Sequence, residues 1–454
     1  MSGKKHFKSF TFIDLFAGIG GFHLALEKLG GKCVFASEIQ PELQQLYEKN
    51  FEMPCFGDIT QLKNEDDILK TIPRHNVLCG GFPCQPFSKA GKQQGFDDEQ
   101  DRGNLFDYIM KIVDARKPEY VFLENVPNLE SHDEGRTWQI IHDRLSVLYD
   151  VKSAILSPHY FGIPQHRTRF YIVCRLKERG DLSQFEFPQR ENVECYIDSI
   201  INPNDKKYLP LRPITRIHLR AWQHFLNLCY DNHIEIPRFP IWAMEWGADY
   251  DFEGLAPINQ EEEDLDGKHG KFGQLIEGNC FDAKLQCLPI YAQTEKTTED
   301  GSFPDWKKEY IRQNRNFYET HREILDQWLP EIQQEGFENS HQKFEWNCGN
   351  TDERPNLYTK IIQFRPSGIR AKLPTFSPAL VLTTTQIPIF PWIMPPDSNE
   401  PGRYMTIKEG AKLQCLQGLK NYPKTISRAF RAFGNAVNAK VVRKIAENFL
   451  EEEK

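Results

Sequence analysis

Short runs of β-branched and aromatic residues alternate with amphipathic stretches over residues 1–190, and this alternation is the strongest constraint on the fold. Parallel strands need a crossover connection, usually a helix, so a repeat of strand and helix patterns predicts a layered α/β domain. The glycine-bounded stretch of residues 21–31 reads as the first such helix. The runs expected to form strands are residues 10–16, 33–37, 76–82, 120–126, 151–157 and 169–175.

The pattern changes after residue 190, where prolines and tryptophans become frequent and strand alternation is irregular. We therefore predict a second domain over residues 191–400, with helical periodicity in residues 306–332. Its acidic stretch, residues 251–266, is expected to be a solvated loop. Helical patterns resume after Gly402, in residues 406–414 and 436–449.

The net charge of the chain is weakly unfavourable for binding a polyanion. Lys and Arg number 56 against 64 Asp and Glu, which gives −8, so any attraction to nucleic acid must come from local patches. Residues 354–396 contain no acid and five cations, which indicates a face that meets an anion. A buried segment with peripheral arginines is the alternative. The five cations are Arg354, Lys360, Arg365, Arg370 and Lys372.

The cysteines and the absence of apolar segments suggest a reducing compartment. The 11 cysteines show no C-x-x-C pair and no histidine at zinc-ligand spacing, so we expect reduced thiols and no metal. The first residues lack the apolar core of a signal peptide, and no apolar run has the length of a membrane span. We expect a soluble cytoplasmic protein.

A glycine-rich turn follows the first expected strand, in Phe12-Ile-Asp-Leu-Phe-Ala-Gly-Ile-Gly-Gly21. Glycine lets the backbone approach a ligand closely, and Glu38, at the end of the next strand, can accept hydrogen bonds from both ribose hydroxyls. Asp58 could hold the adenine amino group. Together these residues indicate an adenosine-containing cofactor. Because the spacing differs from G-x-G-x-x-G, it favours S-adenosylmethionine over NAD.

Cys84 lies between Pro83 and Pro86 directly after an expected strand. The prolines stiffen the backbone and cannot continue the sheet, so the thiol is presented rigidly beside the cofactor turn, as a nucleophile would be. Glu124 ends another apolar strand, where a carboxylate is costly to bury unless it is paired or catalytic. Arg167 and Arg169 would point to one face by strand alternation, either toward this site or as a surface anchor.

These motifs, in this order, resemble those of DNA (cytosine-5) methyltransferases of the bacterial restriction-modification type. The resemblance spans nearly the whole chain, and its most specific part is the prolyl-cysteine followed by Glu-Asn-Val and Arg-x-Arg. Leu416-Gln-Gly418 matches a usual Leu-Gln-Gly run, although Leu419 replaces an expected Phe. The matching segments are residues 12–21, Glu38, Gly57-Asp58, Phe82-Pro-Cys-Gln85, Glu124-Asn-Val126, Gln165-His-Arg-Thr-Arg169, Arg403 to Gln417 and Ala432-Phe-Gly-Asn-Ala-Val-Asn438.

The resemblance implies an S-adenosylmethionine-dependent methyltransferase fold, with a mixed, mostly parallel, doubly wound sheet and a smaller target-recognition domain. Residues 1–190 would form the catalytic and cofactor-binding domain, 191–400 would recognise the target, and 401–454 would return to the catalytic domain. The substrate would be double-stranded DNA, and the protein would act as a monomer in the bacterial cytoplasm, at the nucleoid. A cognate restriction endonuclease is a possible functional partner.

The resemblance also assigns roles to residues. Cys84 would be the nucleophile, Glu124 would contact cytosine N3, and Arg169, with Arg167 beside it, would hold the base. Ser88 and Arg102 would contact DNA from a glycine-punctuated lid of residues 88–104, and Arg365, Arg370 and Lys372 would contact it through guanine or phosphate. The residues expected to bind S-adenosylmethionine are Asp14, Phe16, Gly18, Ile19, Gly20, Glu38, Ile39, Asp58, Ile59, Pro83, Leu105, Asn435 and Val437.

Three other functions stay open on the sequence. An RNA cytosine-5 methyltransferase would share the fold, although the long region 191–400 favours duplex DNA. A DNA-binding regulator without catalytic activity would use residues 354–396, but the intact Cys84, Glu124 and Arg169 set argues against it. A nicotinamide-dependent oxidoreductase is the least favoured, because of the glycine spacing.

Overall fold

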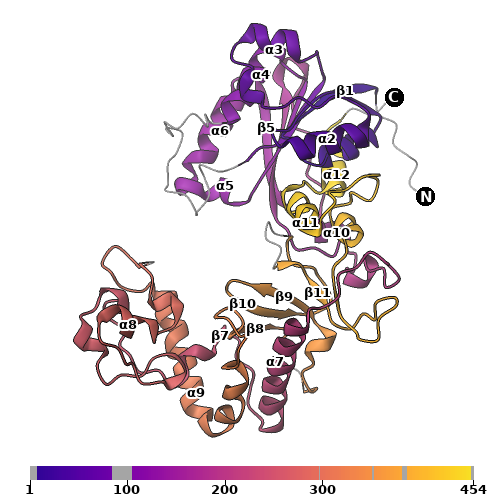
Figure 1. Ribbon diagram of the computed structural model, residues 1–454. Helices are drawn as coiled ribbons and strands as arrows, with labels where there is room; N and C mark the ends of the chain where they lie inside the picture. Colours follow the sequence, from indigo (N-terminus) through magenta and orange to yellow (C-terminus); the bar gives the residue numbers. More distant parts are fainter. Residues whose placement is uncertain (1–7, 84–104, 296, 350–351, 381–385, 451–454) are drawn as a thin grey trace. The chain divides into compact units, whose positions relative to one another are not determined.

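The computed structural model describes residues 8–83, 105–295, 297–349, 352–380 and 386–450 (Figure 1), and the chain divides into two compact units. Unit 1 comprises residues 1–202, 375–384 and 406–454. Unit 2 comprises residues 203–374 and 385–405. The sequence pattern put the boundaries at 190 and 400, whereas the contacts put them after 202 and 405 and return residues 375–384 to unit 1.

Unit 1 is built on a six-stranded sheet in the order β2-β1-β3-β4-β6-β5. Strands β2, β1, β3 and β4 run parallel to one another, and β6 runs antiparallel to both β4 and β5. The predicted mixed, mostly parallel sheet is therefore confirmed. The strands are β1 (Phe10–Leu15), β2 (Gly31–Ser37), β3 (Val77–Gly81), β4 (Tyr120–Asn125), β5 (Tyr149–Leu156) and β6 (Arg169–Leu176).

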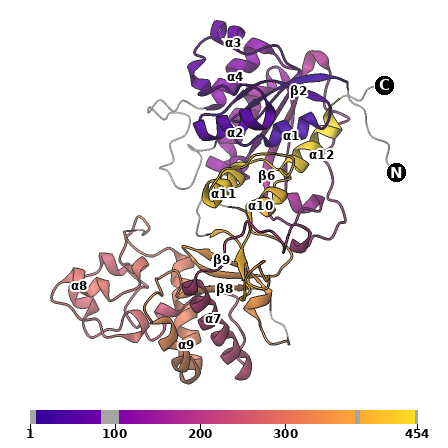
Figure 2. The same cartoon turned by 45° about the vertical axis from the view of Figure 1, so that its right-hand side comes forward.

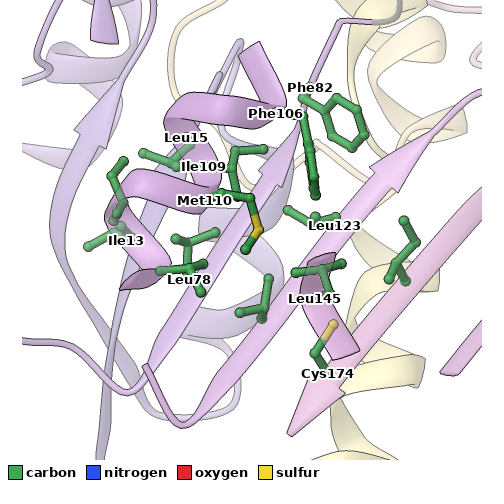
Figure 3. Close-up of a cluster of buried hydrophobic side chains, with 14 of the residues drawn as sticks. Ile13, Leu15, Leu78, Phe82, Phe106, Ile109, Met110, Leu123, Leu145 and Cys174 are labelled. Carbon is green, nitrogen blue, oxygen red and sulfur yellow. The ribbon is translucent and has the colours of Figure 1, made fainter. Parts of the chain in front are cut away.

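Helices cover both faces of this sheet, as expected for a doubly wound fold. Figure 3 shows the core on one face, where α4 (Leu105–Arg116) contributes Phe106, Ile109 and Met110 against Leu78 and Leu123. Helices α3 (Glu65–Thr71) and α6 (Arg136–Ser146) complete this layer through Ile68 and Leu145.

Two helices far apart in sequence form the opposite layer of unit 1. Helices α1 (Gly21–Glu27) and α12 (Ala439–Phe449) lie side by side (Figure 2). Phe122 of β4 packs between them, with ring centroids 5.1 Å from Phe22 and 5.3 Å from Phe449. The remaining helices of unit 1 are α2 (Pro41–Phe51), α5 (Asn128–Ser131), α10 (Ile407–Leu413) and α11 (Ile426–Asn435).

Unit 2 contains a second six-stranded sheet in the order β12-β11-β9-β10-β8-β7. One face of this sheet packs against helices, with Trp222 of α7 stacked 4.7 Å from Phe344 of β8. The strands are β7 (Ile241–Trp242), β8 (Lys343–Asn347), β9 (Ile361–Arg365), β10 (Gly368–Lys372), β11 (Ile389–Phe390) and β12 (Arg403–Tyr404). The helices are α7 (Pro213–Asp231), α8 (Phe281–Gln286) and α9 (Asp305–Ile332).

Helix α9 matches the helical periodicity of residues 306–332, and it buries the apolar side chains of Phe317, Trp328 and Ile332. The backbone departs from helical geometry at His321. Helices α7 and α11 have no counterpart in the sequence prediction. Of the helices in the described ranges, none is long and apolar enough to cross a membrane.

Candidate active site

Two antiparallel neighbours, β4 and β6, bring Glu124 and Arg169 together at one edge of the unit 1 sheet. Nε of Arg169 lies 3.0 Å from Oε1 of Glu124, and only 9% of the Glu124 side chain is exposed. Burial raises the pKa of the Glu124 carboxyl, and the guanidinium groups of Arg169 and Arg167 oppose that rise. The pair is thus a carboxyl group that can hold a proton, oriented by a cation.

Arg167 lies before the start of β6, so strand alternation does not apply to it. Its Nη2 donates hydrogen bonds to the carbonyl oxygens of Gly434, at 2.7 Å, and Ala436, at 3.1 Å. Burial lowers its pKa to about 9. Arg167 therefore anchors the C-terminal segment around Asn435, whereas Arg169 makes the direct contact with the Glu124 carboxylate.

The glycine turn after β1 and the segment after β2 each donate one hydrogen bond to the Glu38 carboxylate. The N–H groups of Gly18 and Gln40 donate to its two oxygens at 2.9 Å each. Glu38 is buried, which raises its pKa, and the next residue, Ile39, leaves 65% of its surface exposed. The oriented Glu38 carboxylate is suited to accept hydrogen bonds from a polar ring, and the exposed Ile39 side chain beside it is suited to pack against a flat aromatic base.

Positive φ angles shape this turn at Phe16 (54°), Gly18 (55°) and Gly20 (88°). A Cβ on Gly20 would lie 2.3 Å from the Phe51 ring, so both the conformation and the space require glycine there. Ile19 is buried and holds the turn against the core.

The C-terminal segment reaches the same edge of the sheet. A Cβ on Gly21 would lie 2.6 Å from the carbonyl oxygen of Val437, and one on Gly81 would lie 3.1 Å from Oε2 of Glu124. The start of α1, the end of β3, Glu124 and Val437 are therefore neighbours. Asn435, the last residue of α11, is exposed.

The other predicted cofactor residues have varied surroundings. Asp58 is half-buried and its Oδ1 accepts from the N–H of Thr60, while Ile59 is buried. Leu105 is half-buried at the start of α4, and Pro83 is exposed at the end of the described segment. The predicted nucleophile Cys84 and the predicted DNA contacts Ser88 and Arg102 lie outside the described residues.

Asp14 lies beneath the glycine turn, with 1% of its surface exposed. Burial raises the pKa of its carboxyl well above the ordinary value, and the Tyr47 hydroxyl lies 3.5 Å from its Oδ2. Nδ1 of His23 lies 2.7 Å from the same hydroxyl. The Asp14 carboxyl is therefore enclosed in the core with Tyr47 and His23 and does not face the protein surface.

Sequence reasoning missed two buried amides at this site. Nδ2 of Asn125 donates to the carbonyl oxygen of Phe82 at 3.2 Å, and Nε2 of Gln414 donates to Oε1 of Gln165 at 3.0 Å. Gln414 is followed by Cys415 in a left-handed conformation, φ 56°. Gln414 is fully buried at the C-terminus of α10, just before the Leu416-Gln-Gly418 run.

Comparisons with known proteins agree with this geometry. Residues 10–227 match the family model described as C-5 cytosine-specific DNA methylase. The Type II methyltransferase M.AluI of Cellulosimicrobium cellulans is 30% identical over 497 residues, which cover 96% of this chain and 91% of that protein. The chain belongs to the C-5 cytosine-specific DNA methylase family. It is an S-adenosylmethionine-dependent DNA (cytosine-5) methyltransferase of the Type II restriction-modification kind.

Other members of the C-5 cytosine-specific DNA methylase family match a shorter part of the chain. The Type II methyltransferase M.HhaI of Haemophilus parahaemolyticus is 42% identical over 203 residues, which cover 44% of this chain and 60% of that protein. Among solved structures, the Entamoeba histolytica methyltransferase EhMeth has a TM-score of 0.52 at 14% identity, over 97% of this chain and 98% of that one. This last similarity concerns the fold alone.

In this methylase three of the five cations of residues 354–396 pair with acids outside that stretch. Arg365 and Arg370 both contact Glu345 of β8, at 3.2 and 2.5 Å, and Arg354 pairs with Asp231 of α7. The local charge of the folded surface is therefore lower than the sequence window suggests. Burial lowers the pKa of Lys372. Within the described ranges, no group of three His, Cys, Asp or Glu could hold a metal ion.

Proposed function

We propose that this methylase transfers a methyl group from S-adenosylmethionine to C5 of a cytosine extruded from a short duplex DNA sequence. The main support is the Glu124 and Arg169 pair, which lies at the sheet edge where the glycine turn, β3 and the C-terminal segment meet. A protonatable carboxyl beside a cationic fork matches the N3 and O2 atoms of cytosine.

The residues around Glu38 fit S-adenosylmethionine, which when bound supplies a methyl group on a sulfonium. The Glu38 carboxylate, oriented by the Gly18 and Gln40 amides, has lone pairs left for both ribose hydroxyls. Ile39 offers an exposed apolar surface for the adenine ring. The bridge between Ser37 of β2 and Phe56 brings the segment before Asp58 beside Glu38, so the Asp58 carboxylate would accept a hydrogen bond from the adenine amino group. Asn435 and Val437 would complete the site.

We propose a covalent mechanism through Cys84. C5 of cytosine is a poor nucleophile, so a thiolate adds to C6 and turns C5 into an enamine-like carbon that can accept the methyl group. Glu124 donates a hydrogen bond to N3 and stabilises the charge that develops during addition, while Arg169 holds O2. A base then removes the C5 proton, and elimination breaks the bond between sulfur and C6, which restores the thiolate.

The cytosine must leave the helix for this chemistry, because its C5 and C6 faces are covered in the stack. Extrusion costs a few kcal/mol, and contacts with the flipped base offset this cost. We assign DNA recognition to unit 2, whose sheet presents Arg365, Arg370 and Lys372 on one face. The size of this unit favours duplex DNA over RNA.

Transfer of tritium from labelled S-adenosylmethionine to duplex DNA tests the proposed function, with competing tRNA in the same assay. We expect incorporation into DNA and its loss in Cys84→Ser, with cofactor binding by calorimetry retained. Incorporation into tRNA instead would overturn the DNA assignment. Undiminished incorporation by Cys84→Ser would exclude the covalent mechanism.

A further inference from the structure

Three strands of unit 2 place two arginines on one carboxylate. Glu345 of β8 lies beside Arg370 of β10 in register, and Arg365 is at the end of β9 on the same face. Nη1 of Arg365 lies 3.2 Å from Oε1 of Glu345, and Nη2 of Arg370 lies 2.5 Å from Oε2. By strand alternation the same face also carries Lys372.

The two arginines are held differently. Arg370 approaches side-on, because both its Nε, at 2.7 Å, and its Nη2, at 2.5 Å, contact Oε2 of Glu345. Arg365 contacts the carboxylate only through Nη1, at 3.2 and 3.5 Å. Side-on pairing fixes the plane of the Arg370 guanidinium and leaves the Nη1 end of its fork for another acceptor.

This cluster differs from a surface ion pair. The side chain of Glu345 is 12% exposed and that of Arg370 is 26% exposed, whereas those of Arg354 and Asp231, which form another ion pair of unit 2, are 51% and 49% exposed. Because the carboxylate and the two guanidinium groups are half-buried, all three lose contacts with water, and this desolvation costs free energy that solvent-exposed ion pairs do not lose. The ion pairs in turn hold the three groups in fixed positions. Such ordering is useful where a side chain must read a fixed pattern of acceptors.

We propose that Arg370, oriented by Glu345, reads a guanine in the recognition sequence through its O6 and N7 atoms. This inference rests on the proposed function, since it needs unit 2 to meet DNA. Guanine presents two acceptors side by side in the major groove, which matches the planar arginine fork and not a lysine ammonium. Glu345 is then a positioning residue, and Arg365 and Lys372 keep the face positive toward phosphates.

The experiment compares Arg370→Lys and Glu345→Gln with the wild type on duplexes randomised around the target cytosine, read by sequencing after base conversion. We expect both variants to lose preference for guanine at one and the same position, by roughly 5- to 150-fold. Arg354→Lys, which changes the exposed pair on the same unit, is the matched control and should keep the full preference. Thermal unfolding checks that each variant is folded.

The salt dependence of DNA binding distinguishes guanine recognition by Arg370 from a phosphate contact and from the absence of any DNA contact. If Arg370 grips phosphate, Arg370→Lys keeps both the sequence preference and the salt slope, and the proposal is wrong. If unit 2 does not meet DNA, neither variant nor Arg365→Ala changes the affinity for the target duplex, which overturns the recognition role itself. A preference that shifts in Arg370→Lys but not in Glu345→Gln would remove the positioning role of Glu345.

Discussion

The Nδ2 atom of Asn125 lies 3.2 Å from the carbonyl oxygen of Phe82, and this hydrogen bond joins the end of β4 to the end of β3. Asn125 is 2% exposed and directly follows Glu124. Phe82 stands two residues before Cys84 in the chain. The amide thus fixes the segment that leads to the proposed nucleophile relative to the carboxyl group proposed to contact the same base.

Asn125→Ala should slow methyl transfer while leaving cofactor binding intact. The Phe82 carbonyl would lose its partner, which costs about 1–3 kcal/mol, and misplacement of the reacting groups lowers the single-turnover rate by roughly 10-fold or more. Asn448→Ala is the control, because its exposed amide makes the same type of bond to the Glu186 carbonyl. Equal rates in both variants would contradict a positioning role for Asn125.

Glu38→Gln should weaken the binding of S-adenosylmethionine. The variant keeps the size of the side chain but loses the charge that strengthens hydrogen bonds to the ribose, which corresponds to roughly 10- to 100-fold in affinity by calorimetry. Glu42→Gln is the matched control, since Glu42 is exposed on α2 and pairs with Arg428 at 3.1 Å. Unchanged affinity in the Glu38 variant would show that the cofactor does not meet this carboxylate.

Gly20→Ala and Gly30→Ala should differ in stability although both glycines have similar φ, 88° and 86°. Both substitutions place alanine in a left-handed backbone conformation, which costs about 1–2 kcal/mol. A Cβ at Gly20 also meets the Phe51 ring at 2.3 Å, whereas one at Gly30 meets nothing within 4 Å. Chemical denaturation should therefore show a larger loss for Gly20→Ala, by about 1–3 kcal/mol. Equal losses would mean that the ring moves freely aside.

His23 should make the protein less stable in acid. Burial lowers its pKa from 6.5 to about 4, so the unfolded chain takes up a proton below pH 6.5 that the folded chain refuses. The contribution of neutral His23 to the free energy of unfolding is fully present above pH 6.5, and it falls by on the order of 2–3 kcal/mol as the pH approaches 4.

The free energy of unfolding of His23→Gln, measured at pH 7 and 4.5, should fall less on acidification than that of the wild type. His233→Asn changes an exposed histidine and is the control. A His23→Gln variant with the same acid sensitivity as the wild type would contradict the assignment to this residue.

The sequence by itself determined the sheet of unit 1 and the order of the motifs. Strand patterns have a short period and depend on local residues, so the six expected runs match β1 to β6 within two residues at each end. The glycine turn could be predicted because a left-handed backbone at Gly18 and Gly20 excludes most side chains. Helices α7 and α11 were missed, since their faces are set by partners distant in the chain.

Only the tertiary structure decided which charges face one another. Glu345 lies outside the acid-free stretch, yet strand pairing places it against Arg365 and Arg370. Likewise, Arg167 and Arg169 are two residues apart, but the chain enters β6 between them, so one binds C-terminal carbonyls and the other Glu124. Hydrogen bonds and ion pairs act over a few ångströms of space, and a distance along the chain does not fix them until the backbone has folded.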